Sequence, residues 1–161
     1  MKLFTGTLFA FLAGSYAWAQ QPGSAPPSST MMTPAMLASS TELTALVDTM
    51  KADIKDQPGV ARALLSSPSH RVILEYRVGP NTPGVHEDNA ELMFFVGGAA
   101  TLVTGGKMVG TNPGTIEGGA SRRVATGDVV LIPEGTPHWL QAIDGSATFF
   151  IAFLPRPPVK Q

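Results

Sequence analysis

Residues 85–98 read VHEDNAELMFFVGG and place an imidazole and a carboxylate at the start of an apolar strand. His86 and Glu91 lie five residues apart, a spacing that suits a short turn followed by a strand. In such a strand, alternate residues from Glu91 point to one side and those from Leu92 to the other. Because both sides are apolar, we expect one to line a barrel interior and the other to meet the N-terminal helix or a second subunit.

A second stretch, residues 127–138, reads GDVVLIPEGTPH and presents a third polar side chain. Its apolar strand ends in a Pro/Gly turn, after which His138 follows. Two imidazoles and a carboxylate suit a divalent first-row metal ion and leave coordination positions open to water or substrate. His86 and Glu91 alone also fit a structural hydrogen bond. With His138 added, His86, Glu91 and His138 form a candidate set of metal ligands.

The chain around these stretches has the twofold period of β-strands from His70 onward. Turn residues separate the strands, and we interpret Gly97-Gly98, Gly105-Gly106 and Asp144-Gly145 as hairpin turns. Residues 110–119, rich in Gly and Thr, are predicted to form a long loop. The predicted strands cover residues 72–78, 91–96, 99–104, 107–109, 122 onward, 129–132, 138–143 and 147–154. So many short strands indicate an all-β fold, closed or in two sheets.

The N-terminal part divides into three segments. Residues 1–19 have the features of a signal peptide: Lys2, a short apolar run and Ala-Trp-Ala before Gln20. Residues 20–39 are predicted to be a disordered tether, because Pro, Ser and Gly dominate without a period. Residues 40–69 are predicted to be helical, with a capping box at Ser39 and Glu42, a helix to Asp56 and a short helical turn over 60–65.

Composition excludes several classes of partner and mechanism. The formal net charge of -1 gives no reason to expect a nucleic-acid partner. The apolar run near the N-terminus is too short to span a bilayer, so we expect no stable membrane anchor. Without cysteine the chain has no disulfide, lipid-modified cysteine or cysteine nucleophile. We therefore expect a periplasmic or secreted protein that binds a small molecule.

The two stretches together resemble the cupin superfamily. Its second conserved block, G-x5-P-x-G-x2-H, is matched at Gly127, Pro133, Gly135 and His138. In the first block, H-x-H-x3–4-E-x6-G, the second His, the Glu and the Gly are matched at His86, Glu91 and Gly98. Gly84 stands where the first His is expected, so a four-ligand site is not supported, and Asp88 is a second choice as an extra ligand.

More specifically, the chain resembles small, exported, single-domain cupins of the type 2 conserved-barrel kind. The strings HEDNAE, LVTGG, IEGGASR and IPEGTPHW carry it. It implies a jelly-roll barrel, or double-stranded β-helix, over residues 70–155, followed by a short tail at 156–161. It also implies a homodimer and a central divalent metal ion, which the ligand types narrow to Fe, Mn, Zn or Ni.

Fold resemblance alone does not assign a reaction. We expect a metal-dependent enzyme of oxygenase or isomerase type acting on a small organic substrate. The alternative is a protein that binds a sugar or organic acid without turnover. Asp88, Glu75 and Tyr76 are the candidates for a general acid or base. Four other polar or aromatic residues are expected to have structural roles: His70, Arg122, Arg123 and Trp139.

Overall fold

The computed structural model describes residues 35–68, 70–111 and 114–156. The predicted signal peptide, most of the predicted tether and most of the tail lie outside these residues. Within the described part, none of the helices has the length and apolar character needed to span a membrane.

The first element is helix α1, Ser40–Asp53. The predicted capping box is confirmed: the Glu42 backbone N–H donates to the Ser39 hydroxyl at 3.2 Å, and the Ser39 N–H donates to the Glu42 carboxylate at 2.7 Å. The helix ends before the predicted Asp56, because Lys55 has a φ of 40° and cannot continue a right-handed helix.

Strand β1, Gly59–Ser66, replaces the helical turn predicted over residues 60–65, so that prediction was wrong. Its Ala, Leu and Arg residues are good helix formers. Pairing with the neighbouring strand β2, Arg71–Arg77, overrides this preference, because each strand provides hydrogen-bond partners for the backbone N–H and C=O groups of the other. Val60 and Leu64 then pack in the core beneath α1. The sheet therefore begins at Gly59, and among the described residues 40–68 only α1 is helical.

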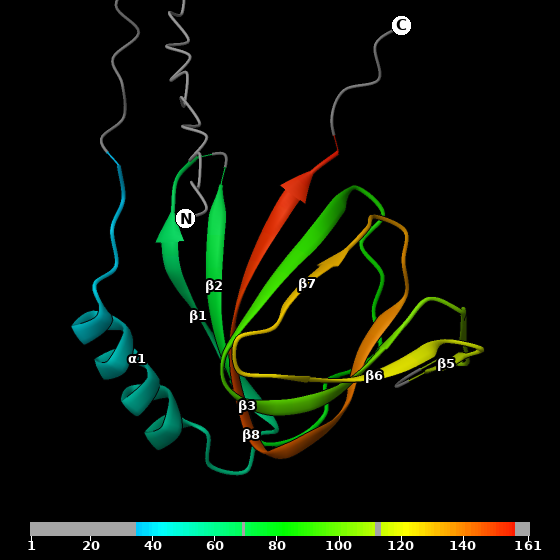
Figure 1. Cartoon of the computed structure of the whole chain (residues 1–161), viewed down its shortest axis with the longest axis horizontal. Helices are drawn as coiled ribbons and strands as arrows, with labels where there is room; N and C mark the ends of the chain where they lie inside the picture. The colour runs from blue at the N-terminus through cyan, green and yellow to red at the C-terminus, as the bar shows by residue number, and fades with distance from the viewer. Residues whose placement is uncertain (1–34, 69, 112–113, 157–161) are drawn as a thin grey trace, which may run out of the picture. The chain divides into compact units, whose positions relative to one another are not determined.

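Strands β3, Asn89–Thr104, and β8, His138–Pro155, form one long antiparallel ribbon (Figure 1). Neither Gly97-Gly98 nor Asp144-Gly145 is a hairpin turn, so both of those predictions were wrong. Instead both lie where the register shifts, so that residues 144–146 bulge beside Ala99. Gly and Asp mark bulges as well as turns, and a bulge bends a ribbon without ending it.

The remaining strands complete the sheet of the described chain, in the order β1-β2-β8-β3-β6, with β7 also pairing with β3. Strands β6, Ala120–Ala125, and β7, Val129–Ile132, occupy successive parts of the same side of β3. Strand β4, Lys107–Val109, pairs with β5, Thr115–Glu117. The predicted loop at 110–119 thus contains a strand, and Gly105-Gly106 does not join a hairpin, since β4 pairs with β5 and not with β3.

Two apolar cores hold the fold together. The larger lies inside the barrel and centres on Phe95 and Phe149, whose ring centroids are 5.0 Å apart. The smaller lies between α1 and the outer face of β1 and β2, around Met50 and Leu74. Each fully buried side chain of this size contributes roughly 1.5–3 kcal/mol. The all-β jelly-roll barrel with an N-terminal helix is therefore confirmed.

Candidate metal centre

Two loops meet at one end of the barrel and hold each other through backbone hydrogen bonds. Gly84 and His138 form an antiparallel bridge, in which each backbone N–H donates to the other's carbonyl at 3.0 and 2.9 Å. The N–H of Gly135 donates to the carbonyl of His86 at 2.8 Å. These bonds bring the segment that carries His86 alongside the start of β8, which carries His138.

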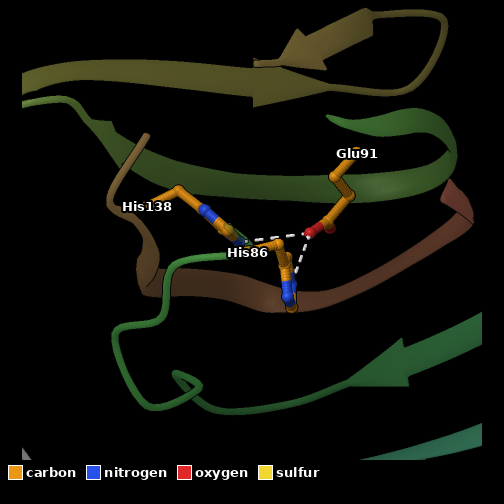
Figure 2. A group of neighbouring side chains, drawn as sticks. All are labelled: His86, Glu91 and His138. Carbon is orange, nitrogen blue, oxygen red and sulfur yellow. Dashed lines mark ion pairs between the residues drawn. The ribbon is translucent and has the colours of Figure 1, made fainter. Parts of the chain in front are cut away.

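The structure brings the three predicted ligands together. Glu91 points inward from β3 and is only 4% exposed. Its Oε2 lies 3.2 Å from Nε2 of His86 and 3.1 Å from Nε2 of His138, as Figure 2 shows. One donor atom from each residue lies within 4.8 Å of the others. His86, Glu91 and His138 thus form a group that could hold a metal ion.

The spacing and chemistry of these donors fit a divalent ion. Bonds of about 2.0–2.2 Å from a metal ion to nitrogen or oxygen place neighbouring ligands about 3.0 Å apart at octahedral angles and about 3.4 Å apart at tetrahedral angles. Both carboxylate–imidazole distances lie in this range. Nδ1 of His138 lies 3.0 Å from the Thr136 carbonyl, to which its proton can be donated. That bond leaves the lone pair on Nε2, directed toward the other two donors.

The metal centre is open to solvent on the side where His86 lies. Its side chain is 41% exposed, whereas His138 and Glu91 are buried. The ring of Phe153 meets the His86 ring edge-on, with centroids 5.0 Å apart, and limits its rotation. A small molecule can therefore approach the three donors from one side while the barrel closes the other.

The pKa of His138 is raised above its ordinary value near 6.5. Burial opposes the charged imidazolium, but the hydrogen bond to Glu91, the bond to the Thr136 carbonyl and the negative charge of Glu91 together outweigh it. Without metal, a proton on His138 therefore stabilises the buried carboxylate. At any pH where His138 is protonated, a metal ion has to displace this proton.

A cavity of about 260 Å³ adjoins the three donors. Apolar side chains make up much of its wall, and Glu75 contributes a further carboxylate. Nη1 of Arg77 lies 3.2 Å from Oε2 of Glu75. Burial raises the pKa of Glu75, and the negative charge of Glu91 adds to this, while Arg77 acts in the opposite direction. The remaining lining residues are Asn81, Thr82, Gly84, Met93, Leu102, Leu140, Phe149, Ile151 and Phe153.

The other two acid–base candidates lie elsewhere. Tyr76 faces the opposite side of β2 and packs in the core beneath α1. Asp88 is exposed, and its carbonyl accepts a hydrogen bond from the backbone of Arg156 at 3.0 Å. Asp88 is not among the residues whose donor atoms converge, so the structure does not favour it as an extra ligand.

The residues expected to be structural lie outside the group of donors. His70, Arg122 and Arg123 are exposed, and Arg123 pairs with Asp144 at 3.1 Å. Trp139 donates its indole N–H to the Asn81 carbonyl at 2.7 Å, which ties the loop before His86 to β8.

Three residues that support the site were not predicted: Arg77, Asn81 and Thr136. Arg77 and Asn81 are ordinary strand-end and turn residues in the sequence. Thr136 acts through its backbone carbonyl, which has no sequence signature.

Metal affinity is expected to fall about tenfold per pH unit once His138 is protonated, because one proton competes with the ion. Since the folded pKa of His138 is raised, this loss begins at a higher pH than for a free imidazole. Conversely, the stability that protonated His138 gives the metal-free protein is present at low pH and lost as pH rises through that pKa. Competition with a chromogenic chelator for Zn(II) between pH 6 and 8 measures the effect. An affinity that does not change over this range would contradict it.

Comparisons with known proteins place this geometry in a family. A family model described as cupin matches residues 52–161. A search of curated proteins gives no match. Among solved structures, hydroxypropylphosphonic acid epoxidase from S. wedmorenis is similar at a TM-score of 0.50 and 19% identity, over 60% of this chain and 51% of that one.

Two further solved structures are similar at the level of fold. A structure of Fe(II) HppE has a TM-score of 0.50 and 18% identity, over 62% of this chain and 52% of that one. KdgF from Halomonas sp. has a TM-score of 0.49 and 20% identity, over 62% and 81%. The family model spans more than half of the chain and includes both loops of the candidate metal centre, so this protein belongs to the cupin family.

Proposed function

We propose that His86, Glu91 and His138 bind one divalent first-row metal ion, and that the protein is a metal-dependent enzyme of oxygenase or isomerase type acting on a small organic molecule. The observation that carries this proposal is the convergence of two imidazoles and a buried carboxylate at 3.1–3.2 Å beside a cavity. HppE, which has a similar fold, has been solved in an Fe(II) form, and this supports a metal of the same type. Fe, Mn, Zn and Ni all remain candidates.

Such an ion supplies Lewis acidity and open coordination positions. The chain's own residues supply the rest of the site. The apolar wall around Met93, Phe149 and Ile151 excludes water from a bound molecule. Thr136 holds His138 in one orientation, and Phe153 limits the motion of His86. Glu75 is the one titratable side chain lining the described cavity beyond the three donors, so it is the acid–base group available there.

The alternative function is binding of a sugar or organic acid without turnover. It is supported by the small number of acid–base groups, since Glu75 is the one such group in the described cavity beyond the three donors. The two functions differ in turnover. Protein loaded with Fe(II) or Mn(II) is incubated with a panel of phenols, diketones and sugars, and oxygen uptake and product are measured. Turnover that disappears in Glu91→Gln supports the enzyme. Compounds that raise the melting temperature but are recovered unchanged support the binding protein.

Replacing Gly84 with histidine is expected to increase metal affinity about tenfold or more by adding a fourth ligand. Gly84 lines the cavity, and a Cβ built there has no atom within 4 Å. Side chains of directly bridged residues point to the same side, so this imidazole would lie beside His138.

Gly84→Ala is the matched control and should leave the affinity unchanged. Zn(II) titration against a competing chelator measures all three proteins. An affinity for Gly84→His no higher than that of Gly84→Ala would mean that position 84 does not face the metal centre.

We also propose a homodimer. Val129 and Leu131 on β7 are 60% and 58% exposed, and each lies directly opposite an outward residue of β3, Phe94 and Leu92. Phe94 is 41% exposed and stacks on Phe150. Helix α1 covers the outer face of β1 and β2, while a second copy would cover this part. Light scattering on wild type and Leu131→Glu tests it: a wild-type monomer would rule out the dimer.

Export is the last part of the proposal. Cleavage after Ala19 would release the protein into the periplasm or the medium. Intact-mass measurement on the exported protein tests this, and a cytosolic protein that retains Met1 would contradict it.

A further inference from the structure

We infer that Glu75 forms the far end of the ligand site, and that the cavity takes a small neutral or cationic molecule with a hydroxyl or amine donor at that end. An anionic group is not expected at that end. The inference rests on the proposed function, since it takes the metal centre as the other end of the same site.

The register of the strands places Glu75 at a distance from the metal centre along the barrel wall. On β8, Phe153 lies opposite Glu91, whereas Phe149 lies opposite Glu75. Ile151, between them, lies opposite Met93. Glu91 and Glu75 thus belong to inward rows four residues apart, about 13 Å along the strand. All six side chains line the same cavity. It therefore has a carboxylate at each end and an apolar belt between them.

The carboxylate of Glu75 has one oxygen committed and one available. Oε2 accepts a hydrogen bond from Nη1 of Arg77 at 3.2 Å. No hydrogen bond from the described residues reaches Oε1. That oxygen is not sealed in the protein, because no buried side-chain oxygen or nitrogen of the described chain lacks a partner. Since Glu75 lines the cavity, Oε1 is an acceptor open to a ligand.

Arg77, two residues after Glu75 on the same face of β2, fixes this arrangement. Its Nε donates to the Gly79 carbonyl at 3.2 Å, and Nη2 donates to the Pro80 carbonyl at 3.0 Å. The side chain is 12% exposed and is not part of the cavity lining. The guanidinium is thus engaged by Glu75 and by the turn after β2. It holds the Glu75 carboxylate in place and opposes the rise that burial causes in its pKa, but it does not present a positive charge to the ligand.

These features set the ligand class. A hydroxyl or amine facing Oε1 forms a charge-assisted hydrogen bond, whereas a carboxylate there meets a negative oxygen and loses its hydration. The belt of Met93, Ile151 and Phe149 favours an apolar body. At about 30 Å³ for each water-sized group, the volume of about 260 Å³ holds on the order of ten non-hydrogen atoms. A small ring with a donor at each end has this size and polarity.

The test compares two probes of that size that differ at one end: hydroquinone and 4-methoxyphenol. The protein is loaded with Zn(II), which does not oxidise them, and affinities are measured by calorimetry for wild type and Glu75→Gln. Wild type should bind hydroquinone at least about tenfold more tightly than 4-methoxyphenol, because 4-methoxyphenol lacks the second donor. Glu75→Gln should lose most of this preference, because the neutral amide cannot form the charge-assisted hydrogen bond with the second hydroxyl.

Equal binding of hydroquinone and 4-methoxyphenol by wild type would overturn the inference. So would an unchanged preference in Glu75→Gln, or failure of wild type to bind either probe. The comparison between the probes in wild type stands on its own if Glu75→Gln does not fold. Zinc content is measured separately: zinc-free wild type would refute the proposed metal centre, whereas zinc-loaded wild type without the donor preference would refute only the role of Glu75.

Discussion

Replacing His138 with alanine should reduce metal affinity at least about 100-fold and leave the purified protein without stoichiometric metal. Loss of residues that only orient a ligand already costs about 10–100-fold, and His138 supplies one of three donors itself. Its orientation is fixed from both sides, through the Thr136 carbonyl and Glu91. Metal analysis of untagged protein purified in parallel measures the effect.

His70→Ala is the control for this experiment, because it removes an imidazole from the surface and not from the group of donors. It should retain the metal content of wild type. Circular dichroism of both variants shows whether the barrel has folded. Stoichiometric metal in folded His138→Ala would mean that the ion binds elsewhere.

Replacing Gly98 with alanine should destabilise the fold by more than about 4 kcal/mol, an exceptionally large effect for one methyl group. Gly98 has a φ of 72°, and a Cβ built there would lie 1.8 Å from the Ser146 carbonyl oxygen and 3.1 Å from Cα of Ala147. Both are backbone atoms of the opposing strand, so the clash can be relieved only if the two strands move apart at the bulge. Total stabilities of about 5–15 kcal/mol leave little reserve, so poor soluble expression is the expected outcome.

Gly105→Ala separates this clash from backbone strain. Gly105 also has a φ of 72°, but a Cβ there meets no atom within 4 Å. Its substitution should cost only the left-handed strain, about 1–2 kcal/mol. Urea denaturation of the three proteins gives the two differences. If both variants lost the same stability, the close approach of Gly98 to Ser146 would not be a constraint on the fold.

Local signals in the sequence predicted local structure well. The Ser39 and Glu42 cap was correct because both partners lie within one helical turn. His86, Glu91 and His138 were found because each ends or begins an apolar strand in a pattern that the cupin family shares. That the three residues would converge followed from the family resemblance and not from the spacing, since 47 residues separate Glu91 from His138.

What the sequence did not reveal depends on pairing between distant strands. Residues 60–65 resemble a helix until β2 is present to pair with them. The dipeptide Asp144-Gly145 is compatible with either a hairpin turn or a β-bulge. Only its pairing with the segment around Gly97-Gly98 shows that it forms a bulge. Likewise, Glu75 and Tyr76 alternate in any strand, but the position of α1 determines which of them faces the cavity.

The bend in the β3–β8 ribbon has a consequence for the order of events in folding. Glu91 lies near one end of the ribbon, opposite Phe153, and His138 near the other, opposite Thr104. In a flat ribbon, 13 residues would separate them by about 43 Å. Their contact at 3.1 Å therefore forms only after the ribbon has paired and bent. A metal ion that joins its two ends binds a barrel that is already closed, so it should slow unfolding much more than it accelerates folding.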